Sequence, residues 1–139
     1  MSARMVTFTL AGHLYGVDVH AVQEVLRGLP RTRIPLAPGG LAGLINLRGQ
    51  VLSAVDLRAQ LDLPSRDADQ EPMLVVIRVV GEPVALLVDT IGSVVDVDAD
   101  QFEPPPDTLS GMSRKVLLGA YKLEHRLLLA LDVERAVAA

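Results

Sequence analysis

Apolar runs of strand length recur along the chain and are separated by short polar turns. Val, Leu and Ile dominate these runs, and several of the turns contain Gly, which suits tight hairpins. The pattern predicts four antiparallel hairpins and one further strand, and therefore a mostly β protein built as a barrel or a sandwich. The predicted hairpins pair residues 5–10 with 14–19, 43–47 with 50–55, 73–80 with 83–88 and 115–121 with 126–131, and the single strand is 91–97.

Helical patterns are scarce, and three short segments carry them. The strongest prediction is a helix over 18–28, where Val19, Val22, Val25 and Leu26 form an apolar stripe that ends at Gly28. The other two predicted helices cover 56–63, which ends before a proline, and the C-terminal stretch from 132. Each of the three begins with an aspartate after an apolar strand, in VDVHAV, VDLRAQ and LDVERA, and an aspartate there caps the free N–H groups of a first helical turn. The recurrence of strand, turn, strand, Asp and helix indicates two similar subdomains.

Composition narrows the class of protein. Half of the 139 residues are apolar, only four are aromatic, and there is no cysteine, which excludes a disulfide scaffold and zinc held by cysteine. The net charge is −4, with six basic and three acidic residues up to residue 60 and seven basic and fourteen acidic residues after it. This asymmetry indicates either that the two halves face different partners or that it serves ordinary surface solubility. No signal peptide or apolar run of membrane-spanning length is present, so we expect a cytoplasmic protein without membrane insertion.

Known catalytic patterns are missing from the sequence. There is no G-x-S-x-G motif and no cysteine nucleophile, so we expect no catalytic residue, no enzyme activity and no cofactor. His13 and His20 leave open a remote alternative, a barrel that binds a metal or another small ligand. The DVDADQFEPPPD stretch fails as a calcium loop because Gln101 and Asp107 replace the required Gly and Glu. The acidic balance and the few aromatic residues also argue against binding to nucleic acid, so the sequence indicates a protein-binding module.

Several motifs in a fixed order then identify a family. YGVDVHAVQEVLRG at 15–28, RIPLAPGGLAGLINLRGQV at 33–51 and VDLR at 55–58 resemble the CheW family of chemotaxis coupling proteins. ALLVDTIGSVVDVDADQFEPPP is similar to the second half of that family, and LLGAYKLEHRLLLALDVERAV to its closing hairpin and helix. The resemblance therefore covers most of the chain.

The resemblance implies a fold and a role. We expect one CheW-like domain over 1–139, mostly β, in which two SH3-like β-barrels pack side by side with a few short helices. Subdomain 1 would hold approximately 14–64, the C-terminal helix and strand 5–10, and subdomain 2 approximately 72–131. The implied role is that of a scaffold without catalysis. It would join the cytoplasmic helical hairpin of a methyl-accepting chemoreceptor to the regulatory domain of a CheA-type histidine kinase, at receptor arrays beneath the inner membrane.

The resemblance also implies site residues. Arg48 matches the receptor-contacting arginine of the family, and its planar guanidinium suits two acceptors at once. The implied receptor-binding set is Val22, Glu24, Gly43, Asn46, Leu47, Arg48, Gly49 and Val51, and the implied kinase-binding residues are Val17 and Val19. Related alternatives are a coupling protein of another chemosensory pathway, such as type IV pilus motility, and a detached regulatory domain of the kinase.

Overall fold

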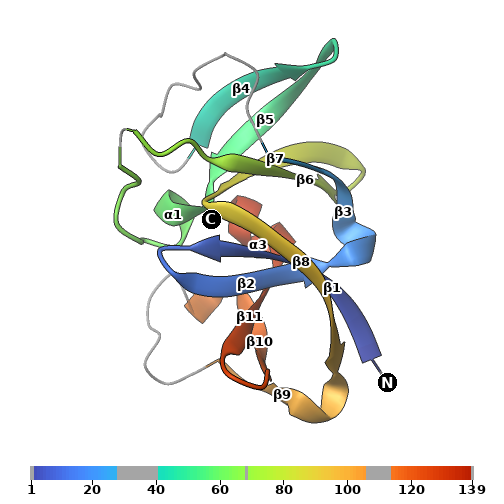
Figure 1. Cartoon of the computed structure of the whole chain (residues 1–139). Coiled ribbons are helices and arrows are strands. Elements are labelled where there is room, and N and C mark those ends of the chain that lie inside the picture. The colour runs from blue at the N-terminus through green and yellow to red at the C-terminus, as the bar shows by residue number, and fades with distance from the viewer. Residues whose placement is uncertain (1, 28–40, 68, 106–113, 139) are drawn as a thin grey trace.

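The strands form two sheets that pack face to face, as the computed structural model shows for residues 2–27, 41–67, 69–105 and 114–138. Sheet A has the strand order β8-β1-β2-β11-β10-β9 and sheet B the order β3-β6-β7-β5-β4 (Figure 1). The strands of sheet A are β1 (Ser2–Leu10), β2 (His13–Asp18), β8 (Thr90–Asp98), β9 (Phe102–Glu103), β10 (Leu117–Lys122) and β11 (Leu127–Leu131). Those of sheet B are β3 (Val22–Leu26), β4 (Leu41–Leu47), β5 (Gln50–Asp56), β6 (Met73–Val79) and β7 (Glu82–Val88).

Three hydrophobic cores among the described residues explain why the apolar runs are continuous rather than alternating. The main core lies between the two sheets, while core B lines the other face of sheet B and core A the other face of sheet A. Along β6, Val75 and Ile77 enter the main core, and Leu74 and Val76 enter core B. A strand whose two faces are both buried needs apolar residues at consecutive positions. The MLVVIRVV run is therefore a consequence of this double burial.

The mostly β fold and the four predicted hairpins are confirmed, and each hairpin agrees with the prediction to within a few residues. The pairing among the described strands leaves open sheets rather than closed barrels. The two-residue strand β9 was not predicted. Residues 106–107 of the DVDADQFEPPPD stretch and residues 33–40 of the RIPLAPGGLAGLINLRGQV motif lie outside the described residues.

The predicted helix over 18–28 is wrong. Residues Val19–Ala21 form a single 3₁₀ turn, η1, and Val22–Leu26 continue as strand β3, paired with β6. The spacing of the valines fits a helix, but these residues are β-branched and favour a strand when a partner edge is available. The predicted end of this helix at Gly28 lies outside the described residues.

The other two helices are confirmed, as α1 (Leu57–Gln60) and α3 (Val133–Ala138). The aspartates act as predicted at all three sites. Asp18 accepts from the backbone N–H of His20, Asp56 from that of Arg58, and Asp132 from that of Arg135. A further 3₁₀ turn, η3 (Ala99–Gln101), begins after Asp98 in the same way.

Neither sheet corresponds to one stretch of the chain. Sheet B combines β3, β4 and β5 with β6 and β7, and sheet A combines β1 and β2 with β8 to β11. Strand β1 lies in the same sheet as β10 and β11, and the chain passes from sheet A to sheet B at η1 and returns at β8 (Figure 1).

Candidate functional site: the Arg48 hairpin and its surroundings

The turn between β4 and β5 places Arg48 at the end of a projecting hairpin (Figure 1). Leu47 pairs with Gln50, and the two residues between them have positive φ, 52° at Arg48 and 86° at Gly49, as in a type I′ turn. The Asn46 side chain accepts from the N–H of Gly49 at 2.9 Å and so fixes the turn. Gly49 suits this backbone, whereas an arginine in the left-handed region costs about 1–2 kcal/mol. The turn therefore does not explain the choice of arginine.

Arg48 is held by Glu24, although the two residues come from opposite ends of sheet B. The Nη2 group donates to both carboxylate oxygens, and its distance to Oε2 is 2.6 Å. Glu24 lies on β3 and Arg48 follows β4, so their side chains link the two end strands of sheet B. The hydrogen bond to Glu24 and the negative charge of Glu24 raise the pKa of Arg48 above its ordinary value. The Arg48 side chain stays 66% exposed and that of Glu24 24% exposed, so the guanidinium is oriented by Glu24 and still open to solvent.

The outward face of β4 and β5 beside this turn carries exposed apolar side chains. Side chains alternate along paired strands, so Leu44 and Val51 lie on the outer face, where they are 67% and 61% exposed. The neighbouring residues on the other face of these strands, Ile45, Leu47 and Leu52, point inward into core B. An exposed apolar pair beside an oriented charged group can contact an apolar strip on another protein while the charge fixes the register.

The structure separates the predicted receptor-binding residues into three kinds. Leu47 is 9% exposed and belongs to core B, and Val22 is half-buried against the main core. Gly43 has φ 113° and lies at the β-bulge where the pairing of β4 with β5 shifts. The exposed members lie together at the hairpin, and they are Asn46, Arg48, Gly49 and Val51. Glu24 contacts Arg48 from β3. Leu44 was not predicted, although strict alternation from the inward-facing Leu47 would have placed it on the outer face.

The predicted kinase-binding residues lie in β2 and in η1, outside the Arg48 hairpin. Val17 has 0% exposure and is part of the main core, so its side chain cannot contact a partner in this conformation. Val19, in η1, is half-buried and packs against the same core.

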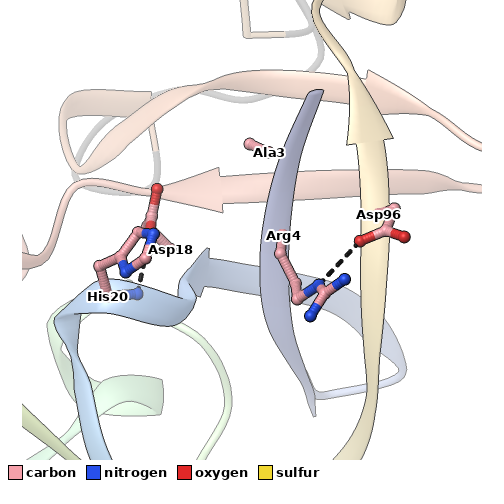
Figure 2. Close-up of a pocket in the computed structure, with 5 residues that line it drawn as sticks. All are labelled: Ala3, Arg4, Asp18, His20 and Asp96. Atoms are coloured by element: carbon pink, nitrogen blue, oxygen red, sulfur yellow. Dashed lines mark hydrogen bonds and ion pairs between the residues drawn. The ribbon is translucent and has the colours of Figure 1, made fainter. Parts of the chain in front are cut away.

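A polar pocket of about 360 Å³ lies next to η1. Figure 2 shows Arg4 of β1 reaching across to Asp96 of β8, an ion pair of 3.0 Å, with Asp18 and His20 on the opposite side. Both members of the ion pair are more than 60% exposed, so it contributes little to stability. In the described residues no three His, Asp or Glu side chains are grouped so as to hold a metal ion. His13 and His20 lie near opposite ends of β2, which separates the two histidines of the metal-binding alternative.

Sequence reasoning missed a buried ionic cluster at the junction of β7 and β8. Asp89 accepts from Arg58 at 2.9 Å and 2.5 Å, from Arg66 at 3.1 Å, and from the N–H of Ala11 at 2.9 Å. Asp56 lies 3.6 Å from the Arg66 guanidinium and completes the cluster. These groups join the β1–β2 turn of sheet A to α1 and to the connection after it. The VDLR motif placed Arg58 after an aspartate cap, but its partner at position 89 is distant in sequence.

The cluster determines the charge state of Asp89. Burial alone would raise the pKa of this carboxyl, but the hydrogen bonds from Arg58, Ala11 and Arg66 outweigh it, and the pKa lies below its ordinary value. The pKa of Arg58 is correspondingly raised by its hydrogen bond to Asp89. Asp89 is therefore an ionised carboxylate that holds elements of both sheets together.

The fold and the comparisons with known proteins together place the chain in a family of non-enzymatic scaffold proteins. The CheW-like domain family matches residues 4–139, and the chain belongs to this family. The chain is 30% identical to the chemotaxis protein CheW of Klebsiella aerogenes, over 94% of this chain and 79% of that protein. It is 29% identical to CheW of Rhizobium meliloti, over 94% and 84%, and 29% identical to CheW of Bacillus subtilis, over 93% and 83%.

A solved structure supports the same assignment. The chain is similar to the scaffolding protein TtCheW from Thermoanaerobacter tengcongensis, with a TM-score of 0.84 and 27% identity, over 100% of this chain and 94% of that one. The resemblance drawn from the motifs is thus confirmed at the level of the family. Among the helices of the described residues, none is long and apolar enough to cross a membrane.

Proposed function

We propose that this protein is a cytoplasmic adaptor that couples the helical hairpin of a methyl-accepting chemoreceptor to the regulatory domain of a CheA-type histidine kinase. One observation carries the receptor half of the proposal. Arg48 is exposed, is oriented by Glu24, and lies beside the apolar Leu44 and Val51. A receptor helix packs apolar residues on Leu44 and Val51 and offers its acceptors to the guanidinium.

The turn backbone supports a role for Arg48 outside folding. A two-residue type I′ turn favours Asn-Gly or Asp-Gly, and an arginine at the first position is strained. Glu24 limits the freedom of the long side chain before the partner arrives, which lowers the entropy lost on binding. Glu24 is then a positioning residue, and Arg48 is the residue that contacts the receptor.

We propose that the kinase binds at the η1 turn after β2, and not at the β4–β5 hairpin. Val19 is half-buried beside the pocket formed with Asp18 and His20, and this surface lies on the junction from sheet A to sheet B. A related barrel in the kinase contacts Val19 there. Separate surfaces allow both partners to bind at the same time. A coupling protein of a related pathway, such as type IV pilus motility, would use the same two surfaces with a different receptor.

The test is the charge reversal Arg48→Glu. It places two carboxylates at the hairpin and is expected to weaken binding to a receptor cytoplasmic fragment at least tenfold, while kinase binding and the melting temperature stay nearly unchanged. Arg4→Glu is the matched control, because Arg4 is also an exposed arginine in an ion pair, on sheet A. The proposal fails if Arg48→Glu and Arg4→Glu bind the receptor fragment equally well.

Glu24→Lys tests the positioning role. Alone it is expected to weaken receptor binding, and in combination with Arg48→Glu it restores the ion pair with reversed polarity. The double variant should recover hairpin order in NMR spectra without recovering receptor binding. Recovery of both would show that only the pairing matters and not the guanidinium.

A further inference from the structure

Four non-glycine residues in the described part of the chain have positive φ, namely Ala11, Arg48, Asp62 and Val80. The structure accounts for three of them. The N–H of Ala11 donates to Asp89 at 2.9 Å, which holds the turn after β1, and Asp62 follows α1, where aspartate tolerates the left-handed backbone that ends a helix. Arg48 is the proposed receptor contact. Val80, in the turn between β6 and β7, has no such explanation among the described contacts.

Valine is a poor choice for this turn. Val80 has φ 50° and Gly81 has φ 80°, the backbone of a type I′ turn, which favours Asn-Gly. A β-branched side chain is the least suited to the left-handed region, and strained residues of this kind are typical of binding sites. The Val80 side chain is 87% exposed, so burial does not offset the strain. Folding and solubility therefore both favour another residue, whereas a partner that covers the side chain accounts for the valine.

The β6–β7 turn lies at the end of sheet B where the chain enters from η1. Val22, the first residue of β3, pairs with Ile77 near the end of β6, and β6 contacts η1. The turn lies on the same side of the molecule as the start of β3 (Figure 1). Val19 of η1 and Val79 of β6 are half-buried against the main core. Together with the exposed Val80 they form an apolar patch, which we call the η1 patch.

Polar side chains border the η1 patch. Arg78 and Glu82, on either side of the β6–β7 turn, are exposed, and Asp18 and His20 line the polar pocket beside η1. An apolar centre with a polar border is the usual anatomy of a protein–protein interface. Val80 projects from this surface at the tip of the turn, so a protein that covers it must offer an apolar pocket.

The η1 patch adjoins the surface proposed for the kinase. Val19 belongs to both, and Val17, the other kinase-binding residue expected from the sequence, is fully buried in the main core. The receptor hairpin lies on the other side of the β6–β7 turn, since β7 and β5 separate β6 from β4. Val80 therefore continues the kinase surface and supplies an exposed apolar side chain that Val17 cannot supply.

We infer that Val80 is an apolar anchor for the regulatory domain of the kinase, and that it enters an apolar pocket on that domain when the η1 patch is covered. This inference rests on the proposed function, because the occupant is the kinase partner named there. Burial of the isopropyl group in the complex offsets the backbone strain, which the free protein carries without compensation. Val80 determines the affinity for the kinase and has no part in receptor binding.

Val80→Asn tests the inference, because asparagine relieves the backbone and removes the apolar side chain. Titration calorimetry with a regulatory-domain fragment of a CheA-type kinase should show an affinity weaker by about tenfold, while the melting temperature rises slightly and the affinity for a receptor fragment is unchanged. Stability and kinase binding then change in opposite directions, which a structural role for Val80 does not produce. Val80→Gly removes the same side chain without adding a polar one and should lose the same affinity.

Two controls are matched to this variant. Ala11→Asn changes a residue with the same φ of 50°, in the turn at the opposite end of β2 from η1, and should leave kinase binding unchanged. Leu44→Ser removes an exposed apolar side chain at the receptor hairpin and should weaken receptor binding only. The inference is overturned if Val80→Asn binds the kinase fragment as wild type does, or if it weakens receptor binding instead. Failure of the wild-type protein to bind the kinase fragment overturns the kinase half of the proposed function as well.

Discussion

Replacing Asp89 by Asn is expected to destabilise the protein strongly, because Asp89 is the shared acceptor of the buried cluster. Its side chain is 6% exposed and faces two guanidinium groups that are 12% and 8% exposed. Asn preserves the volume and one acceptor oxygen but removes the negative charge, which leaves the buried Asp56 and the exposed Asp67 as the carboxylates near the two arginines. Removing one member of a buried ion pair costs about 3–5 kcal/mol, and the retained oxygen places Asn near the lower end, about 3 kcal/mol. For a chain of this size that corresponds to a decrease in melting temperature of roughly 10 °C.

The same substitution predicts a change in pH dependence. The pKa of Asp89 is lower in the folded state than its unfolded value of about 3.9. The carboxylate therefore stabilises the fold above about pH 4, and this contribution is lost as the pH falls through the folded-state pKa. The stability difference between wild type and Asp89→Asn should be full at pH 7 and should shrink as the pH approaches 3.

Urea unfolding followed by circular dichroism at pH 7 and pH 3 measures both effects. Asp96→Asn is the control, because Asp96 also pairs with an arginine but is 70% exposed, and its loss should cost less than about 0.5 kcal/mol. The reasoning is refuted if Asp89→Asn and Asp96→Asn have the same free energy of unfolding at pH 7, or if the deficit of Asp89→Asn is as large at pH 3 as at pH 7.

Three further substitutions give separate tests. Gly119→Ala is expected to lower stability by about 1–3 kcal/mol in urea unfolding, because the new Cβ would lie 2.4 Å from Phe102 Cζ and 2.5 Å from a backbone oxygen. Val80→Asn should raise the melting temperature slightly, since this 87% exposed valine has φ 50° and Asn tolerates that backbone at lower cost; a decrease would contradict the strain argument. Leu44→Ser should leave the melting temperature within about 2 °C of wild type and weaken receptor binding in titration calorimetry, and unchanged affinity would remove the outer face of β4 from the proposed site.

Local features of the fold were predictable because a few neighbouring residues determine each of them. Asp56 and Asp132 cap helices whose first turns directly follow them, and the Gly-containing turns close hairpins between adjacent runs. The failed helix at 18–28 shows the limit of this reasoning. Val22 and Val25 have the spacing of a helix, but both pair with β6, about fifty residues away, and that pairing determines the strand.

The features of the candidate site also differ in whether the sequence could predict them. The sequence indicated Arg48 in a hairpin turn and Val51 beside it, because both lie within one local motif. Burial of Val17 and Leu47 was not predictable, since each needs a second layer of chain to cover it. The exposed Leu44 could be inferred only after the inward face of β4 was known.

The sequence by itself determined the strands of the four hairpins, the tight turns, the aspartate caps and the family to which the chain belongs, because each is encoded in contiguous residues. Tertiary structure alone decided that Glu24 orients Arg48, that Asp89 accepts from two arginines, and that strands from both ends of the chain share sheet A. The physical reason is distance along the chain. Pairing between remote strand edges and remote charges depends on how the whole backbone is routed, and hydrophobic periodicity specifies which face of a strand is buried without specifying which partner buries it.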